Sequence, residues 1–205
     1  MQFLYLASRS PRRRELLRQV GIPFRLIDVE VDESPLEGEA AIDYVGRLAR
    51  EKAQTAARQL SASGWESAPV LAADTTVALD GRILGKPVSA EDAVNMLMYL
   101  SGRKHAVHTG VALFRAGKAD RVEKVEICVV TTHVCFAPFE QQEIERYVAT
   151  GEPMDKAGAY GIQGYGGVLV ERIEGSYSNV VGLPIRETAT LAARFGIACW
   201  QTENN

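Results

Sequence analysis

The chain has 205 residues, of which 46% are hydrophobic and 24% charged, and its formal net charge is −3. These values exclude wholesale disorder, a collagen-like repeat and a coiled coil. The length suits one domain, or two closely packed lobes. A weakly acidic chain also argues against a general nucleic-acid-binding protein, which usually carries a basic excess.

The three cysteines form no CxxC pair, and no apolar run approaches the ~20 residues that a membrane helix needs. The first residues lack the order of a signal peptide, because the basic side chains follow the apolar ones. We therefore expect reduced cysteines, no membrane partner and a cytoplasmic location.

Strand and helix patterns alternate along the chain, which predicts an α/β or α+β fold. Residues 3–7 are predicted to form a buried strand, and a helix is expected from Pro11, with Ser10 as its N-cap. Arg25–Val29 is predicted as a second strand. A long helix with an apolar stripe is expected from about Glu39 to Leu60.

The middle of the chain reads as mostly β. Val70–Ala73 and Thr76–Leu79 are predicted strands, and a capped helix is expected from Ser89 to about Ser101. His105–Phe114 and Val122–Phe136 are rich in Val and Thr and are predicted to form an antiparallel hairpin.

The last quarter begins and ends with a predicted helix, Phe139–Ala149 and Pro184–Phe195. Between them, Gly151–Gly167 is predicted as a glycine-rich loop and Val168–Ile173 as a strand.

The segment SRSPRR, from Ser8 to Arg13, joins the first predicted strand to the first helix. A helix N-terminus attracts anions, and the guanidinium groups of Arg12 and Arg13 fit phosphate oxygens. The alternative is a capped helix with two solvated arginines.

Lys52 falls on the apolar stripe of the long helix, where an ammonium group needs a partner unless it extends past the edge of the core. Asp74 follows an apolar strand, where α/β proteins place catalytic and metal-binding groups, although a turn residue is the alternative. Glu33, after the second strand, could converge with Asp74 on a hard cation, and Asp32 competes with it for that role.

Lys86 lies in GRILGKP, which is not a P-loop because the glycine spacing and Pro87 do not fit that motif. A solvated loop lysine is the alternative. In the glycine-rich loop, the amide of Gln163 could read the edge of a base, and its glycines permit close approach to a ligand. A surface loop without function is the alternative here.

Together, Arg12, Arg13, Lys52 and Lys86 would form a positive group beside these carboxylates in an acidic chain. This combination suits a polyanionic small molecule held with a divalent metal, and it indicates hydrolysis of nucleoside triphosphates as the reaction class.

Several segments carry a resemblance to a known family: LASRSPRRRELL, VDES, RLAREKA, AADTTV, GKP, SGRKHAVHTGVAL, YVATGEPMDKAGAYGIQG and GSYSNVVGLP. The chain resembles the Maf family of nucleoside triphosphate pyrophosphatases over nearly its whole length. The resemblance implies one Maf-like (ITPase-like) α/β domain over residues 1–205. That domain would have two closely packed lobes and an extended mixed sheet, flanked by helices, around a central substrate cleft.

The resemblance also implies hydrolysis between the α and β phosphates with Mg²⁺ or Mn²⁺, and it allows a homodimer. It implies substrate-binding roles at five positions, Ser8, Arg12, Arg13, Lys52 and Lys86. Glu33 and Asp74 are expected to hold the metal, and Asp74 is expected to accept a proton from the attacking water. A metal-bound hydroxide is the alternative base.

Three positions bear on the substrate: Arg12, Thr75 and Gln163 match the family members that hydrolyse dTTP and UTP. Members that act on 7-methyl-GTP typically have Trp, Gln and Glu there. An amide both donates and accepts, as a uracil or thymine edge requires. The alternatives are a 7-methyl-GTP or purine-directed pyrophosphatase, and a non-catalytic nucleotide-binding regulator of cell division. A nucleic-acid-binding module would need aromatic stacking platforms on a basic face, and no such cluster is visible.

Overall fold

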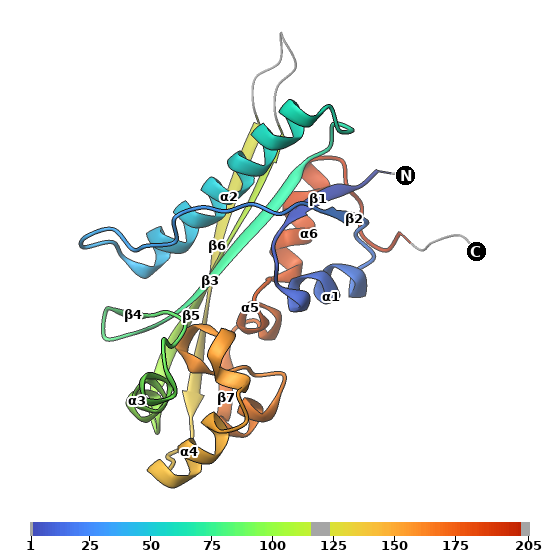
Figure 1. Ribbon diagram of the computed structural model, residues 1–205. Helices are drawn as coiled ribbons and strands as arrows, with labels where there is room; N and C mark the ends of the chain where they lie inside the picture. Colours follow the sequence, from blue (N-terminus) through green and yellow to red (C-terminus); the bar gives the residue numbers. More distant parts are fainter. Residues whose placement is uncertain (1, 116–123, 202–205) are drawn as a thin grey trace. The chain divides into compact units, whose positions relative to one another are not determined.

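The computed structural model describes residues 2–115 and 124–201, in which strands and helices alternate (Figure 1). The strands are β1 (Leu4–Ala7), β2 (Phe24–Leu26), β3 (Val70–Leu79), β4 (Arg82–Leu84), β5 (Lys104–Arg115), β6 (Lys124–Phe136) and β7 (Val170–Glu174). The α-helices are α1 (Pro11–Gln19), α2 (Ala41–Ser63), α3 (Ala90–Leu100), α4 (Gln141–Val148), α5 (Tyr177–Val181) and α6 (Ile185–Arg194). Three short 3₁₀ helices are η1 (Glu152–Asp155), η2 (Ala157–Ala159) and η3 (Tyr165–Leu169).

The strands form one seven-stranded sheet in the order β2-β1-β3-β5-β6-β7, with β4 paired to β3. β1 is parallel to both of its neighbours, β2 and β3, whereas β4 and β7 pair antiparallel with β3 and β6. The mixed sheet flanked by helices confirms the predicted fold class.

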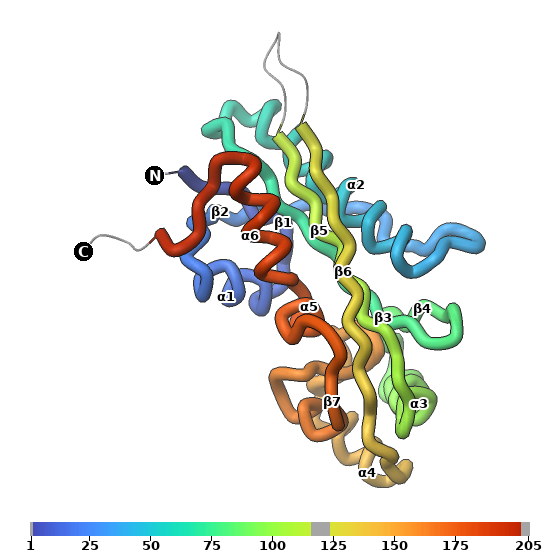
Figure 2. The backbone as a smooth tube through the Cα atoms, turned by 180° about the vertical axis from the view of Figure 1, so that it is seen from behind, coloured from blue at the N-terminus to red at the C-terminus, as the bar shows by residue number. Residues whose placement is uncertain are grey.

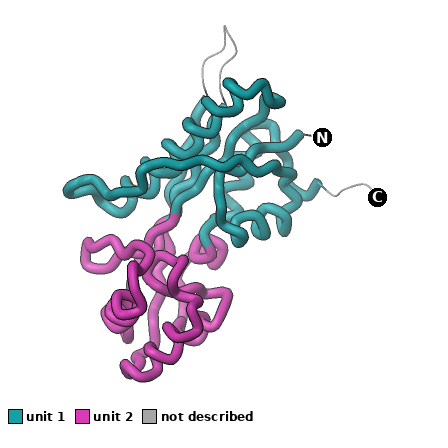
Figure 3. Tube along the Cα trace, viewed as in Figure 1, with its two compact units in different colours: residues 1–74, 109–129, 182–205 teal, residues 75–108, 130–181 magenta. Residues whose placement is uncertain are grey.

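The chain divides into two compact units (Figure 3). Unit 1 contains residues 1–74, 109–129 and 182–205, and unit 2 contains residues 75–108 and 130–181. β3, β5 and β6 contribute residues to both units. The close packing of two lobes around a cleft stays a prediction.

In unit 1, α2 covers one face of the strands, and α1 and α6 lie on the other face (Figures 1 and 2). All four residues of β1 are buried, as expected for a strand covered on both faces. The side of α2 that packs on the strands consists largely of alanines, namely Ala49, Ala53, Ala56 and Ala57. Such small side chains let the helix backbone approach the sheet closely.

In unit 2, the core forms where α3 and α4 pack together beside the ends of the long strands. Its members include Leu97, Val107, Phe136 and Ile144. β3 and β4 are joined at Asp80 and Gly81, which both have positive φ angles, 51° and 77°. This is the backbone that a tight hairpin turn requires, and Asp-Gly adopts it readily.

One prediction about β3 was wrong. The two short strands expected on either side of Asp74 and Thr75 form one continuous strand, Val70–Leu79. The β-branched Thr75 and Thr76 favour extended backbone, so the chain does not turn at Asp74.

Other boundaries also differ from the predictions. β2 ends at Leu26 rather than Val29, and the predicted loop 151–167 contains η1, η2 and the start of η3. β5 and β6 are neighbours in the sheet, while the residues that join the two strands of the predicted hairpin, 116–123, lie outside the described residues.

The three cysteines are free, and only Cys135 is fully buried. Within residues 2–115 and 124–201, no helix is both long and apolar enough to cross a membrane.

Candidate active site

Lys52 binds two carboxylates in unit 1. Its Nζ lies 2.6 Å from Oε1 of Glu33 and 2.6 Å from Oδ1 of Asp74. The side chains of Lys52 and Asp74 are each only 12% exposed, whereas that of Glu33 is 50% exposed. The lysine on the apolar stripe therefore has partners and does not simply extend past the core.

The strand register explains where Asp74 lies. Ala7, the last residue of the parallel strand β1, pairs with Ala72 of β3. Asp74 therefore lies two residues beyond the carboxyl end of β1, although it is in the interior of its own strand. The carboxyl ends of parallel strands are where α/β folds bind ligands, and Ser8 leaves β1 at the same edge.

Helix α2 holds the segment that carries Glu33. The Oη of Tyr44 donates to the backbone oxygen of Glu33 at 2.9 Å, and Nη2 of Arg47 donates to that of Ser34 at 3.1 Å. Arg47 also forms a two-pronged ion pair with Glu39, at 2.6 and 2.7 Å. Since Lys52 lies on the same helix, α2 fixes both the backbone and the carboxylate of Glu33.

The structure also separates Glu33 from its competitor. Asp32 accepts a hydrogen bond from the backbone N–H of Ser34 at 2.9 Å, and hydrogen bonds from the side chain and the backbone of Ser34 lower the pKa of Asp32. The Asp32 carboxylate thus closes a turn of its own segment, and Glu33 is the residue that contacts Lys52.

Arg13 links the start of α1 to the residue that follows α5, Gly182. Its Nε donates to the backbone oxygen of Gly182 at 2.8 Å, and its Nη1 donates to Oγ of Ser8 at 3.2 Å. Burial lowers the pKa of Arg13, and the negative charges of Asp74 and Glu33 oppose that shift. The carboxylates of Asp74 and Glu33 are therefore close enough to interact electrostatically with the guanidinium group of Arg13.

The charge of Arg12 also lowers the pKa of Arg13, because the two cations follow each other on the first turn of α1. The expected side-chain cap at Ser10 is not formed; instead the N–H of Ser10 donates to Oγ of Ser8 at 3.2 Å. Unit 1 thus contains three cations and two carboxylates in one electrostatic group, Arg12, Arg13, Lys52, Glu33 and Asp74.

This arrangement fits a metal that is shared with a phosphate ligand. No group of three or more His, Cys, Asp or Glu side chains that could hold a metal occurs in the described part of the chain. Glu33 and Asp74 nevertheless present oxygens to one point, now taken by the Lys52 ammonium. Mg²⁺ typically uses one or two carboxylates and completes its shell with water and substrate phosphates, so two carboxylates are sufficient.

The remaining three predicted residues belong to unit 2. Thr75 follows Asp74 on β3, so its side chain points to the opposite face of the sheet. Lys86 is exposed between β4 and α3, and Gln163 is exposed between η2 and η3. The structure therefore brings together the unit 1 members of the predicted site.

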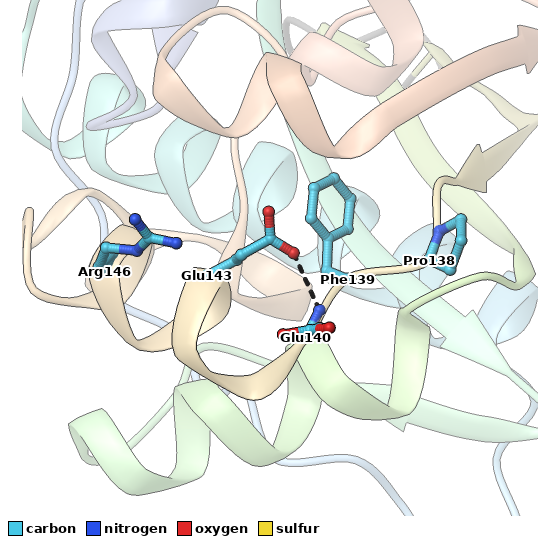
Figure 4. A pocket seen from close by; sticks show the side chains of 5 residues that line it. All are labelled: Pro138, Phe139, Glu140, Glu143 and Arg146. Atoms are coloured by element: carbon cyan, nitrogen blue, oxygen red, sulfur yellow. Dashed lines mark hydrogen bonds between the residues drawn. The ribbon is translucent and has the colours of Figure 1, made fainter.

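A separate hollow of about 610 Å³ lies in unit 2 at the start of α4 (Figure 4). It is lined by Pro138, Phe139, Glu140, Glu143 and Arg146, and by none of the predicted site residues. Oε2 of Glu143 accepts a hydrogen bond from the N–H of Glu140 at 3.0 Å. These acidic side chains thus serve the helix start as a capping box.

Sequence reasoning missed the contributions of Tyr44, Arg47 and Gly182. A weak signal for Tyr44 was present, since it precedes Lys52 by eight residues and so lies about 80° from it around the predicted helix. No comparable signal marked Gly182, which contributes only a backbone oxygen from the far end of the chain.

Comparison with known proteins gives a consistent picture. A family model described as Maf-like protein matches residues 3–195. The chain is 53% identical over 204 residues to a dTTP/UTP pyrophosphatase of Methylobacillus flagellatus, covering 100% of this chain and 98% of the relative. It is 53% identical over 193 residues to one of Chromobacterium violaceum, covering 94% of each chain. It is 55% identical over 194 residues to one of Myxococcus xanthus, covering 95% of this chain and 93% of the relative.

Proposed function

The chain belongs to the Maf family, and we propose that it hydrolyses dTTP and UTP to the nucleoside monophosphate and pyrophosphate. One observation carries this proposal: relatives described as dTTP/UTP pyrophosphatases match nearly the whole chain at about half identity. Such an enzyme removes triphosphates from the nucleotide pool.

The cationic residues are proposed to hold the triphosphate. Arg12, Arg13 and Lys52 lie in unit 1, and Lys86 is expected to contribute from unit 2. Guanidinium forks and ammonium groups bind phosphate oxygens and offset the charge that grows on them in the transition state. The Ser8 hydroxyl is proposed to bind substrate as well, and its contact with Arg13 supports a place beside the guanidinium group.

Asp74 is proposed to accept a proton from the attacking water. The water oxygen forms a bond to the α phosphorus, the bond from that phosphorus to the bridging oxygen breaks, and pyrophosphate leaves. The 2.6 Å contact with Lys52 orients the Asp74 carboxylate in a buried setting, which supports a general-base role.

Glu33 and Asp74 are also proposed to hold a divalent cation, Mg²⁺ or Mn²⁺. When bound, the cation would neutralise phosphate charge and polarise the α phosphate. Lys52 contacts both carboxylates and is proposed to bind the triphosphate beside them.

Selectivity for the pyrimidine base is assigned to Gln163, with Arg12 and Thr75. The Gln163 side chain is exposed on its loop and therefore accessible to a base. Its amide can accept from the N3–H of uracil or thymine and donate to O4.

The test is pyrophosphate release from dTTP, UTP, CTP, GTP, ATP and 7-methyl-GTP, each with and without Mn²⁺. We expect metal-dependent release from dTTP and UTP. Release from 7-methyl-GTP instead would keep the enzyme class and overturn the base assignment. Tight nucleotide binding without any release would favour a non-catalytic regulator.

The homodimer and the cytoplasmic location stay predictions. Sedimentation of the purified chain tests the first, and cell fractionation tests the second.

A further inference from the structure

Glu152, the first residue of η1, is surrounded by the glycine-rich loop that follows it. Its Oε1 accepts hydrogen bonds from Oη of Tyr147 at 2.9 Å and from the N–H of Gly166 at 3.0 Å. Its Oε2 accepts one from the N–H of Tyr165 at 2.8 Å. One carboxylate thus satisfies two backbone donors of the loop and the phenol of α4.

The glycines of this loop let its backbone lie directly against the side chains of Glu152 and Tyr147. A Cβ at Gly164 would lie 2.1 Å from Oε2 of Glu152, and a Cβ at Gly166 would lie 2.5 Å from Oη of Tyr147. Both distances are too short for a real contact, so the loop passes directly over Glu152 and Tyr147 only because these positions lack side chains.

Gln163 lies inside the segment that is held in this way. On one side of it, the N–H of Gly161 donates to Oη of Tyr147 at 3.4 Å. On the other side, the N–H groups of Tyr165 and Gly166 donate to Glu152. The backbone on both sides of Gln163 is therefore fixed by the same pair of side chains, while its own side chain is exposed.

The charge of Glu152 is suited to this task. Burial by itself would raise its pKa, but hydrogen bonds from Gly166, Tyr165 and Tyr147 outweigh burial, and the pKa is lowered. The carboxylate is thus ionised at neutral pH, and an ionised acceptor forms stronger hydrogen bonds than a neutral one.

We propose that Glu152 is a positioning residue for base selection, which acts by holding the backbone on both sides of Gln163. The inference rests on the proposed function, in which Gln163 reads uracil and thymine. It goes further by assigning to Glu152 the discrimination between uracil and cytosine.

The chemistry of the two bases explains why position matters. Uracil presents an N3–H donor beside the O4 acceptor, and cytosine presents the reverse, an N3 acceptor beside an N4 amino donor. An amide carries both a donor and an acceptor, and it discriminates only while its two ends are held in register with the base edge. A loop that moves lets the amide satisfy either base.

The experiment measures kcat/KM for UTP and for CTP in four variants, and compares the ratio of the two values. The variants are Glu152→Gln, Tyr147→Phe, Gln163→Ala and the double variant with Glu152→Gln and Gln163→Ala. Glu145→Gln is the matched control, because it makes the same substitution on an exposed side chain of α4. Partial unfolding lowers kcat/KM for UTP and for CTP by the same factor, so it leaves their ratio unchanged.

We expect Glu152→Gln to lower the UTP-to-CTP ratio roughly tenfold, since the amide cannot accept from both backbone donors. Tyr147→Phe is expected to lower it less, because it removes the phenol and its Gly161 contact but leaves the two backbone contacts of Glu152. The double variant is expected to match Gln163→Ala, as two residues that act through one contact are not additive. The ratio of Glu145→Gln should equal that of the unmodified enzyme.

A folded Glu152→Gln variant with an unchanged ratio would overturn the inference, and so would additive losses in the double variant. If Glu152→Gln does not fold, an unchanged ratio in Tyr147→Phe overturns it instead. A different result would contradict the base-reading role of Gln163 in the proposed function. If Gln163→Ala leaves the ratio unchanged, the base-reading role of Gln163 is lost and the inference with it. If only Gln163→Ala lowers the ratio, the inference alone fails.

Discussion

Lys52 is the residue on which the unit 1 site is centred, because its ammonium group touches both of the carboxylates expected to bind metal. Removing one member of a buried ion pair usually destabilises a fold, because the remaining charge is left buried without a partner. Here the second carboxylate, Glu33, is half exposed and stays available as a partner. A change at Asp74 should therefore affect the reaction more than the fold.

Asp74→Asn is expected to lower kcat for dTTP and UTP by about 10²–10⁴-fold, because the amide cannot accept the proton. The shape of the side chain is kept, and Lys52 retains its 2.6 Å contact with Glu33. Pyrophosphate release and a thermal melt on the same preparation measure the two effects.

Asp80→Asn is the matched control for that variant. Asp80 is an exposed carboxylate at the turn after β3, where it pairs with Arg103 at 2.5 Å. An exposed ion pair contributes little to stability, and Asn tolerates the positive φ angle of that position. A near-normal rate in Asp74→Asn would contradict the assignment of the base and favour a metal-bound hydroxide.

His105 predicts a pH effect on stability. It is 2% exposed, its Nε2 lies 2.8 Å from Oη of Tyr160, and burial lowers its pKa from 6.5 to about 4. The unfolded chain therefore binds a proton below about pH 6.5 that the folded chain refuses until about pH 4. The free energy of unfolding should fall as the pH drops through this window, by about 3 kcal/mol from this group.

The measurement is urea unfolding of the unmodified protein and of His105→Gln between about pH 4 and pH 7. Glutamine can bond to Tyr160 and does not titrate in this range. The variant should show a weaker pH dependence, and the difference between the two curves isolates His105. Parallel curves would mean that His105 does not take part.

Among the elements, α2 does the most to shape unit 1. Its alanine face lies against the strands, and its polar residues Tyr44, Arg47 and Lys52 hold the Glu33 segment. The backbone of α2 also approaches β5 closely at Gly110, where a Cβ would lie 2.2 Å from the backbone oxygen of Val45. The helix backbone cannot yield as a flexible side chain could.

Gly110→Ala is therefore expected to destabilise the protein by about 1–3 kcal/mol or more, through overpacking between α2 and β5. Gly46→Ala, on the helix side, is the matched control. Its Cβ would meet only Cγ2 of Val129, at 3.5 Å, and alanine favours a helix interior over glycine by up to about 1 kcal/mol. Thermal melts should move in opposite directions, and equal shifts would contradict the close approach.

The elements also show what the sequence could predict. Long periodic segments such as α2 and the β-branched β5 were identified correctly, because each pattern persists over several turns or pleats. The short helix α5 was missed, because its five residues are too few for a period to be recognised. The break expected between two strands at Asp74 was wrong, because a single acidic residue suggests a strand end, whereas its partner Lys52 makes a buried position tolerable.

At the scale of the whole molecule, the sequence proposed candidate site residues but did not show which of them meet. Glu33 and Asp32 were equivalent by spacing, and only the contact with Lys52, nineteen residues after Glu33, separates them. The Gly182 oxygen that binds Arg13 lies 169 residues away in the chain. Contacts of this kind follow from the folded path of the backbone and leave no local pattern.

The charge of the whole molecule leads to a last prediction. A chain with a net charge of −3 should repel a triphosphate at long range, while Arg12, Arg13 and Lys52 attract it at short range. Salt screens both effects, but the attraction by the nearby cations outweighs the repulsion when UTP enters the site. We therefore expect kcat/KM for UTP to fall as the salt concentration rises from about 0.05 M to about 0.5 M. Arg12→Ala should weaken this dependence, whereas Arg186→Ala, an exposed arginine on α6, should leave it intact. Sucrose at matching osmolarity controls for viscosity and water activity. If kcat/KM stays constant or rises with salt, long-range repulsion dominates and the cation group does not steer the substrate.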